Sequence, residues 1–460
     1  PAVIADQVGD NVGDCAGRGS DLFESISDDY ITAMILGSML FSPLGINALL
    51  FPLMLGASGI LATIVGVFVI IALRRMRPIM SFNTGLFATA IFCILGAFLS
   101  SIVLLKDVTL LYAVASGLVA SLAVGLVVQY YTGINGRPVR KIAESSERGA
   151  AINIITGLSY AFQSPFLPLL LVLMAFLFSY LITNGSLYGI VAANIGTDLA
   201  VGIIMSSDTF GPISDNAAGI AQMSRTKTQN GVLEELDAMG NTTKAYTKAF
   251  ATASGTVSTV VIFITYGEIV KLYLVSLSLL SPIIIVGLLL GAALPFFFSS
   301  LAIGATGKTA YQIVDEARRQ FRENPGIIEG KAKPDYARCV DIGTKNALKQ
   351  MIAPGLLAIA SPIVVGLLLG KYALGAMLLG GLSMSSLLSP FFTFGGGMWD
   401  NAKKHIERKF WMNGTPTHVA AVIGDTVGDP LKDVAGPSLN IFMKLTNMTA
   451  LFIAPILLLL

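Results

Sequence analysis

The sequence has little charge of either sign. Only 13% of its 460 residues are Asp, Glu, Lys or Arg, whereas 54% are hydrophobic; a soluble chain carries about a quarter charged residues. High hydrophobicity also excludes a disordered chain. Because 30 Lys and Arg residues face 28 Asp and Glu residues, there is no basic excess to neutralise phosphates, and nucleic acid is excluded as a partner.

Cysteine and histidine are equally scarce. Three scattered cysteines, Cys15, Cys93 and Cys339, argue against a disulfide framework or a cysteine-based metal site. Two histidines, His405 and His418, argue against imidazole-centred catalysis and a histidine-rich metal site. The sequence begins at Pro1 without a methionine or a signal peptide, so we expect a fragment that lacks its true N-terminus.

What the sequence does contain is a series of long apolar segments. They predict an all-α membrane protein, a multi-span transmembrane helix bundle, because each segment is long enough to cross a bilayer as a helix. We expect residues 1–460 to form a single transmembrane domain. The eleven predicted spans lie at about 20–42, 47–73, 82–105, 108–131, 151–182, 186–210, 245–267, 273–304, 347–370, 373–399 and 419–460.

Basic residues follow every second span, whereas the intervening links carry little beyond Lys106, Lys271 and Lys371. The positive-inside rule places the basic loops in the cytoplasm. The N-terminal motif and residues 400–433 therefore share the cytoplasmic side. The basic loops hold Arg74, Arg75 and Arg77; Arg137, Arg140, Lys141 and Arg148; Arg225 and Lys227; eight Lys and Arg residues in 305–346; and Lys403, Lys404, Arg408 and Lys409.

Aspartates recur at i, i+4 and i+8 in two segments that also align with each other, AVIADQVGDNVGDCAG and AVIGDTVGDPLKDVAG. This spacing stacks the carboxylates along one helical face. The alignment indicates an internal repeat, and interleaved glycines allow neighbouring helices to approach closely. The repeats hold Asp6, Asp10 and Asp14, then Asp425, Asp429 and Asp433, with a fainter third copy at Asp208 and Asp215.

So many negative charges require compensation in a medium of low dielectric. Oxygen ligands without His or Cys favour Mg²⁺ or Ca²⁺. Nearby lysines, which bind phosphate oxygens, favour a Mg²⁺-phosphate species. The alternative is that these acids cap helices or form interfacial ion pairs. The lysines are Lys248, Lys403, Lys404 and Lys432.

Further acids continue along the first predicted span, and one lysine lies at a comparable depth in the last. A buried acid near a buried lysine is typical of a proton or cation relay. Alternatively, the last two acids mark the end of a short span, and Arg18 rather than the lysine is the partner of the first acid. The residues are Asp21, Glu24, Asp28, Asp29 and Lys444.

The segment GATGKT at 304–309 is similar to the end of a phosphate-binding GxxxxGK[ST] loop. The required first glycine is replaced by Ala302, and no buried strand precedes it. We interpret it as a helix-end turn without nucleotide binding.

Five motifs together resemble the membrane-integral pyrophosphatases, ion pumps that hydrolyse inorganic pyrophosphate. They are DQVGDNVGDCAGRGSD, GPISDNAAGIAQM, LDAMGNTTKAYTK, GGGMWDNAKK and GDTVGDPLKDVAGPSLNIFMK, in family order. The family fold has sixteen transmembrane helices, so the resemblance implies that the eleven spans are helices six to sixteen. It further implies a homodimer, the lipid bilayer as surroundings, and hydrolysis on the cytosolic side.

The resemblance also implies roles for individual residues. The catalytic pair Asp14 and Asp433 would position and deprotonate the attacking water. Pyrophosphate oxygens would bind Lys248, Lys403 and Lys432. Mg²⁺ would bind Asp10, Asp215, Asn241 and Asp429, with Asp6, Asp400 and Asp425 close by. The ion gate would comprise Asp21, Glu24 and Lys444, and Asp28 adds an acid one turn beyond Glu24.

Potassium-independent members of the family carry Lys and Thr where this sequence has Lys244 and Thr247. The resemblance therefore implies potassium independence and pumping of protons rather than Na⁺. Arg18, Gln222 and Asp28 depart from the common pattern, and the additional acid at Asp28 leaves the identity of the ion open. We favour a prokaryotic cell membrane over an organellar one.

Two other functions fit the acids alone. One is a Na⁺-pumping pyrophosphatase, and the other is a non-enzymatic cation exchanger that uses the carboxylates as transport ligands. An exchanger has no need of four lysines beside its ligand acids, so the sequence favours the enzyme.

Overall fold

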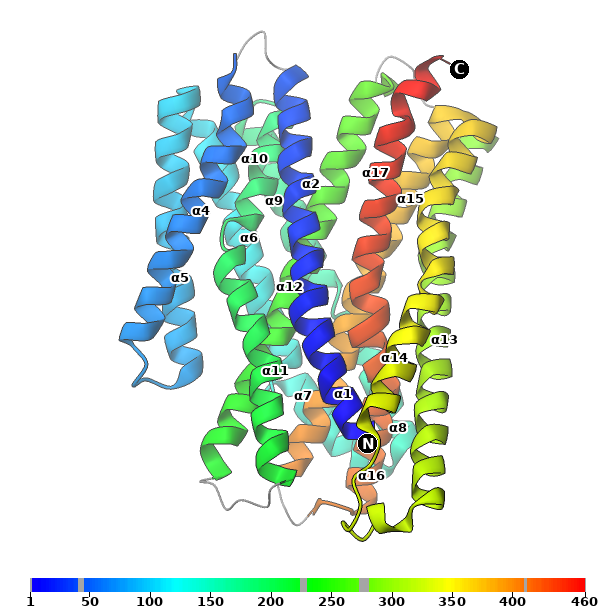
Figure 1. The fold of residues 1–460 in the computed structure, drawn as a ribbon. Helices are drawn as coiled ribbons and strands as arrows, with labels where there is room; N and C mark the ends of the chain where they lie inside the picture. Colours follow the sequence, from blue (N-terminus) through cyan, green and yellow to red (C-terminus); the bar gives the residue numbers. More distant parts are fainter. Residues whose placement is uncertain (1, 40–44, 224–229, 273–280, 409–411, 460) are drawn as a thin grey trace.

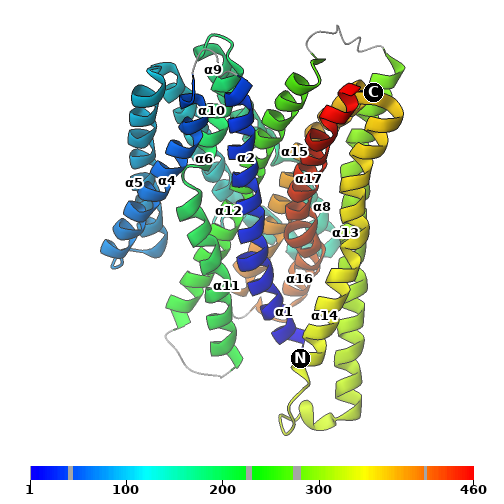
Figure 2. The same cartoon turned by 45° about the horizontal axis from the view of Figure 1, so that its top comes forward.

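A computed structural model describes residues 2–39, 45–223, 230–272, 281–408 and 412–459. Within these ranges every regular element is a helix, which confirms the all-α prediction. The helices form an elongated bundle in which the N- and C-termini lie at opposite ends (Figures 1 and 2).

The first repeat opens the bundle as one nearly continuous rod. It comprises α1 (Ala2–Asp10), the π-helix η1 (Asn11–Gly17) and α2 (Arg18–Met39), which climbs from the N-terminal end towards the opposite end (Figure 1). Because α2 continues to Met39, the alternative that Asp28 and Asp29 mark the end of a short span is wrong.

Three long helices follow α2. They are α4 (Asn47–Ala72), α5 (Pro78–Ser100) and α6 (Val108–Thr132). Pro78 begins α5, where its missing N–H removes no helical hydrogen bond. Asp107 caps α6, because its Oδ1 accepts a hydrogen bond from the Thr109 N–H at 2.8 Å. Helices α4 and α5 form the outer edge of the bundle (Figure 2).

The predicted spans at 151–182 and 186–210 are each broken into two helices. The first divides into α8 (Ala150–Gln163) and α9 (Phe166–Ile182), after the short α7 (Arg137–Ser145). The second divides into α10 (Leu187–Asp198) and α11 (Val201–Met223). Every residue of α10 from Tyr188 to Asp198 is buried, so α10 is an internal helix.

The C-terminal half consists of longer helices. At about 1.5 Å per residue, the 42 residues of α13 span roughly 63 Å, about twice the thickness of the hydrocarbon layer. Gly370 adopts a φ of +86° within α15, which favours glycine, and it separates the predicted spans 347–370 and 373–399. The elements are α12 (Asn230–Ile269), α13 (Pro282–Glu323), α14 (Tyr336–Gln350), α15 (Ile352–Glu407), α16 (Pro416–Asp429), the π-helix η7 (Pro430–Ala435) and α17 (Gly436–Leu459).

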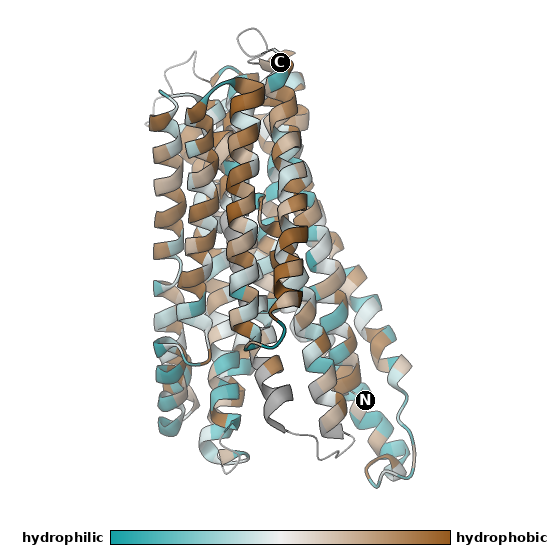
Figure 3. Ribbon diagram, turned by 90° about the vertical axis from the view of Figure 1, so that its left-hand side faces the viewer, coloured by the Kyte–Doolittle hydropathy of each residue, from teal (hydrophilic) through white to brown (hydrophobic). Residues whose placement is uncertain are grey.

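Eight helical stretches of the described chain are long and apolar enough to cross a membrane. They contain nine of the eleven predicted spans, because the stretch Tyr336–Glu407 holds two of them. The other two are the acid-rich α2 and the shorter apolar helix Ser254–Ile269. Polar residues gather at the end of the bundle that holds the N-terminus, and hydrophobic residues dominate the rest of its length (Figure 3). The chain is therefore a multi-pass membrane protein.

The segment 304–309 lies inside the continuous helix α13. Our interpretation of it as a helix-end turn is therefore wrong. The apolar residues on both sides of the segment continue the helix through its two glycines.

Candidate functional site

The GGGMW motif brings α15 into direct contact with the second repeat. A Cβ atom on Gly396 would lie 2.4 Å from the carbonyl oxygen of Gly428 and 2.6 Å from the Cβ of Lys432. Only glycine permits this approach. Trp399, three residues later, is 1% exposed, and its indole N–H donates a hydrogen bond to the Asn153 carbonyl of α8 at 3.4 Å. The backbone thus fixes the distance between α15 and η7.

This approach places Lys432 among the carboxylates of both segments. Its Nζ donates hydrogen bonds to Asp400 Oδ2 at 2.6 Å and to Asp429 Oδ1 at 2.8 Å, and lies 3.8 Å from Asp433 Oδ2. Lys403 donates to Asp425 and lies 4.0 Å from Asp400 Oδ1. The ammonium groups of Lys403 and Lys432 therefore lie between carboxylates of α15 and of the second repeat.

The two repeats adopt the same local structure. Each passes from an α-helix into a π-helix at the equivalent residue, Asn11 in the first repeat and Pro430 in the second. Asp14 and Asp433 occupy matching places within these π-helices. Such π-segments are rare and are common at functional sites. The internal repeat predicted from the sequence is thus also a repeat of backbone conformation.

The charges of the second repeat also act on the first. Desolvation by the surrounding protein, together with the negative charges of Asp429 and Asp433, raises the pKa of Asp6 on α1. Lys432 and Lys403 lie near enough to oppose this rise. The carboxylates of α1 and η7 therefore share one electrostatic site, although they are separated by almost the whole sequence.

The other predicted residues border this site to different degrees. Asp215 on α11 lies 3.9 Å from Lys404 Nζ on α15. Asp10 ends α1 and is half-buried. The side chains of Asn241, Lys244 and Lys248, on α12, lie outside the described residues.

Thr247 is the described member of the pair predicted to determine potassium independence. Its side chain is completely buried, and its hydroxyl donates to the carbonyls of Thr243 at 3.0 Å and Ile204 at 3.3 Å. It therefore ties α12 to α11.

The donor set fits a magnesium ion in its chemistry. All predicted ligands present oxygen, and Asp425 Oδ1 is buried without a hydrogen-bond partner among the described residues. No three His, Cys, Asp or Glu side chains in the described ranges are grouped so that they could hold a metal ion. A Mg²⁺ ion at this site would take its remaining ligands from water and from phosphate oxygens of the substrate.

A second buried network lies further along α2. Arg18 Nη1 donates to Asp21 Oδ2 at 2.9 Å, and Arg18 Nε lies 3.7 Å from Asp208 Oδ2. Lys444 Nζ, on α17, donates to Ser25 and lies 3.8 Å from Asp21 Oδ1. Both alternatives for the partner of Asp21 are therefore realised at once, and all five side chains are buried.

Glu24 and Asp28 lie within the electrostatic field of Lys444. Neither forms a direct ion pair with it in the described part of the chain. Sequence reasoning assigned no role to Asp198, which is 3% exposed at the end of α10. Its position inside the predicted span 186–210 was the available signal, since an acid within a membrane span is functional by default.

Comparison with known proteins identifies this arrangement. A profile of the family described as "Inorganic H+ pyrophosphatase" matches residues 1–453. The chain belongs to this family. It is thus a membrane-bound inorganic pyrophosphatase and a pyrophosphate-energized ion pump.

Individual relatives agree on pyrophosphate and differ in the ion. A K(+)-insensitive pyrophosphate-energized proton pump of Methanosarcina mazei is 44% identical over 99% of this chain and 69% of its own length. A protein of the same name from Caldanaerobacter subterraneus is 44% identical, over 99% of this chain and 68% of its own length. A candidate K(+)-stimulated pyrophosphate-energized sodium pump of Clostridium tetani is 42% identical, over 100% and 69% respectively.

Proposed function

We propose that this pyrophosphatase hydrolyses Mg-pyrophosphate on the cytosolic side of a prokaryotic cell membrane and couples hydrolysis to proton translocation without requiring potassium. The observation that carries the proposal is the alternation of lysines and carboxylates around Lys432 at the contact between α15 and η7. Such a site binds a polyanion and a divalent cation together.

The lysines would bind the substrate. Lys403 and Lys432 each contact carboxylates whose charge a magnesium ion would also neutralise. Their ammonium groups could therefore turn from the carboxylates to phosphate oxygens with little movement of the side chains. Lys248 on α12 would be the third lysine that binds pyrophosphate. The proposed Mg²⁺ ligands are Asp6, Asp10, Asp215, Asn241, Asp400, Asp425 and Asp429. When bound, the ion supplies charge neutralisation to pyrophosphate and to the departing phosphate.

Asp14 and Asp433 would position the attacking water and accept its proton. Their matching places in η1 and η7 support this pairing. A carboxylate beside another carboxylate is a stronger base than it is alone, because the neighbouring charge favours its protonation.

The ion gate would be the network of Asp21, Glu24, Asp28 and Lys444. We also propose that the chain forms a single transmembrane domain and works as a homodimer. Potassium independence would follow from Lys244 beside Thr247, because a tethered ammonium group can replace a bound K⁺ next to phosphate. The relatives named as potassium-insensitive proton pumps support this choice of ion.

The test uses the protein expressed from its complete gene and reconstituted into vesicles that contain a pH-sensitive dye. Adding Mg²⁺ and pyrophosphate outside should release phosphate and acidify the interior. Asp433→Asn should abolish both signals, whereas Asp315→Asn, at an exposed position of α13, should preserve both. Absence of phosphate release by the wild type would refute the enzyme. Phosphate release that needs Na⁺ and causes no acidification would identify a sodium pump instead.

A further inference from the structure

A pair of buried carboxyl groups lies beside the gate network but outside it. Asp29 on α2 is 1% exposed, and Asp198 at the end of α10 is 3% exposed. The two carboxyl groups are held side by side by serines one turn apart on α12, because Ser258 donates to Asp29 and Ser254 donates to Asp198. Carboxylates can only accept hydrogen bonds, so two of them buried together favour a proton on one of the pair.

The partners of each oxygen atom indicate where such a proton would bind. Ser258 donates to Asp29 Oδ2 at 2.8 Å, and Ser254 donates to Asp198 Oδ1 at 2.7 Å. The remaining oxygens, Asp29 Oδ1 and Asp198 Oδ2, are buried, and no donor among the described residues reaches them. A proton bound at either of these atoms would supply a donor that the site lacks. Asn194, completely buried beside Asp29, has no other partner for its amide in the described ranges.

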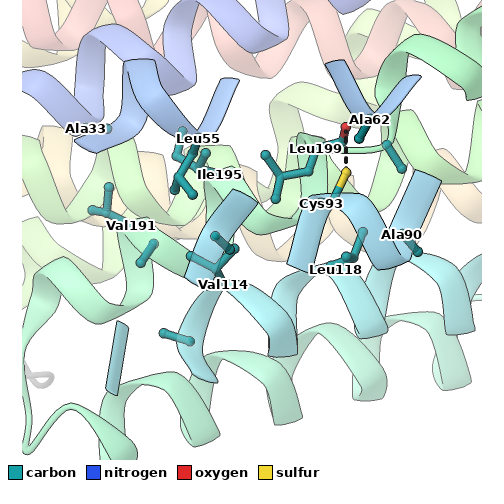
Figure 4. Packing of buried hydrophobic residues seen from close by; sticks show 14 of the residues in the cluster. Ala33, Leu55, Ala62, Ala90, Cys93, Val114, Leu118, Val191, Ile195 and Leu199 are labelled. Atoms are coloured by element: carbon teal, nitrogen blue, oxygen red, sulfur yellow. Dashed lines mark hydrogen bonds between the residues drawn. The ribbon is translucent and has the colours of Figure 1, made fainter. Parts of the chain in front are cut away.

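The surroundings disfavour a second negative charge on the pair. Asp198 is the last residue of α10, where the helix dipole is negative. Apolar side chains from four helices pack around this part of α10, including Leu55, Val191, Ile195 and Leu199 (Figure 4). The thiol of Cys93 donates a hydrogen bond to the carbonyl oxygen of Leu199 (Figure 4).

The pair adjoins the gate on the side away from the catalytic site. Ser25, which accepts a hydrogen bond from Lys444, lies one turn before Asp29 on the same face of α2. The separation along the helix is about 6 Å. The titratable groups that face the pair are Lys444 on α17, Asp28 and Tyr30 on α2, and Cys93 near Tyr30.

We propose that Asp29 and Asp198 form a second proton-binding site that receives the translocated proton after the gate. The pair passes from a charge of −2 to −1 when a proton binds between Asp29 Oδ1 and Asp198 Oδ2, and returns when the proton leaves towards the far side. This role rests on the proposed proton pumping. The serines one turn apart on α12 hold the two carboxyl groups near each other, which favours a proton over a sodium ion that would need to separate them.

The first test compares coupling in Asp29→Asn and Asp198→Asn with the wild type in vesicles of the complete protein. Both variants should retain pyrophosphate hydrolysis and transport several-fold fewer protons per pyrophosphate. An unchanged ratio in both would overturn the proposal. Two serine variants are compared in the same assay. Ser258→Ala is the test, because Ser258 donates to Asp29, and Ser27→Ala is the control, because Ser27 donates to the carbonyl of Phe23.

Loss of the Ser258 hydroxyl removes a donor that stabilises the charged pair, so the proton should be held more tightly. The pH optimum of pumping should therefore move upward in Ser258→Ala and stay in place in Ser27→Ala. A purely structural role for the pair would lower activity without moving the optimum, and that result would overturn the proposal.

Infrared spectroscopy tests the site without substrate or turnover. The wild type at neutral pH should show the carbonyl stretch of a protonated, buried carboxylic acid, and Asp198→Asn should lose it. Persistence of the band in both Asp29→Asn and Asp198→Asn would overturn the assignment. Because this measurement needs no pyrophosphate, it decides the protonation of the pair even if the wild type fails to hydrolyse pyrophosphate, an outcome that would refute the proposed function separately.

Discussion

The contact at Gly396 allows a sharp test of how the catalytic geometry is built. In Gly396→Ala the new methyl group would lie 2.4 Å from Gly428 O, 2.6 Å from Lys432 Cβ and 3.0 Å from Lys432 N. Ordinary contact begins at 3.4 Å, so the two segments must separate by about 1 Å. Two of the three atoms belong to the backbone, so a change of rotamer cannot relieve the clash.

The displacement falls directly on Lys432. Overpacking of this size costs about 1–3 kcal/mol of stability, which a large bundle can tolerate. A shift of about 1 Å in a residue that positions substrate lowers turnover by roughly 10²-fold. We therefore expect Gly396→Ala to insert in the membrane and to release phosphate about a hundred times more slowly.

Gly397→Ala is the matched control for this prediction. A Cβ atom there would meet only the Thr132 side chain at 3.5 Å, which is ordinary contact. Both variants carry the same chemical change at adjacent positions of α15. The assay is the initial rate of phosphate release from Mg-pyrophosphate by detergent-solubilised protein of verified oligomeric state. Equal rates for the two variants would refute the argument that close approach at Gly396 positions Lys432.

Other perturbations test the charges. Lys432→Met should leave Asp400 and Asp429 without their shared partner and lower kcat/KM by about 10²-fold. The assay is a steady-state titration with pyrophosphate. Wild-type values of kcat and KM in this variant would exclude Lys432 from substrate binding. Lys244→Ala should create a requirement for K⁺, seen as phosphate release that rises with added KCl; an unchanged response would refute the proposed role of that lysine. Chelation of Mg²⁺ should stop hydrolysis, and adding Mg²⁺ back should restore it, whereas activity that survives chelation would contradict the assigned donor set.

Much of the architecture could be predicted because it depends on local pattern. Apolar length and the charge of alternate loops predicted the helices and placed both repeats on one side, and the i, i+4, i+8 aspartates predicted stacked carboxylates. The helical break at Leu199 and Ala200 could not be predicted, because the apolar sequence continues through it. Around the break α10 packs mainly against α6 and α9, and these contacts come from distant parts of the sequence.

The sequence also could not predict which partners the buried charged residues contact. Asp21 had two candidate partners and contacts both, since Arg18 is one turn away on α2 and Lys444 arrives from α17. The pairing of Asp29 with Asp198 depends on where α10 ends relative to α2. Spacing within one helix carries no information about this relation between two helices.

The internal repeat connects the proposed catalytic site with the proposed ion gate. Ser25 and Lys444 are separated by 419 residues, the same separation that relates Asp6 to Asp425 and Asp14 to Asp433. The hydrogen bond between them therefore joins equivalent positions of the two repeats. In each repeat a single helical rod runs from the proposed catalytic aspartate in the π-helix to this bond. We therefore expect a movement of either aspartate towards pyrophosphate to shift the Ser25–Lys444 contact, and with it the charge that faces Asp21.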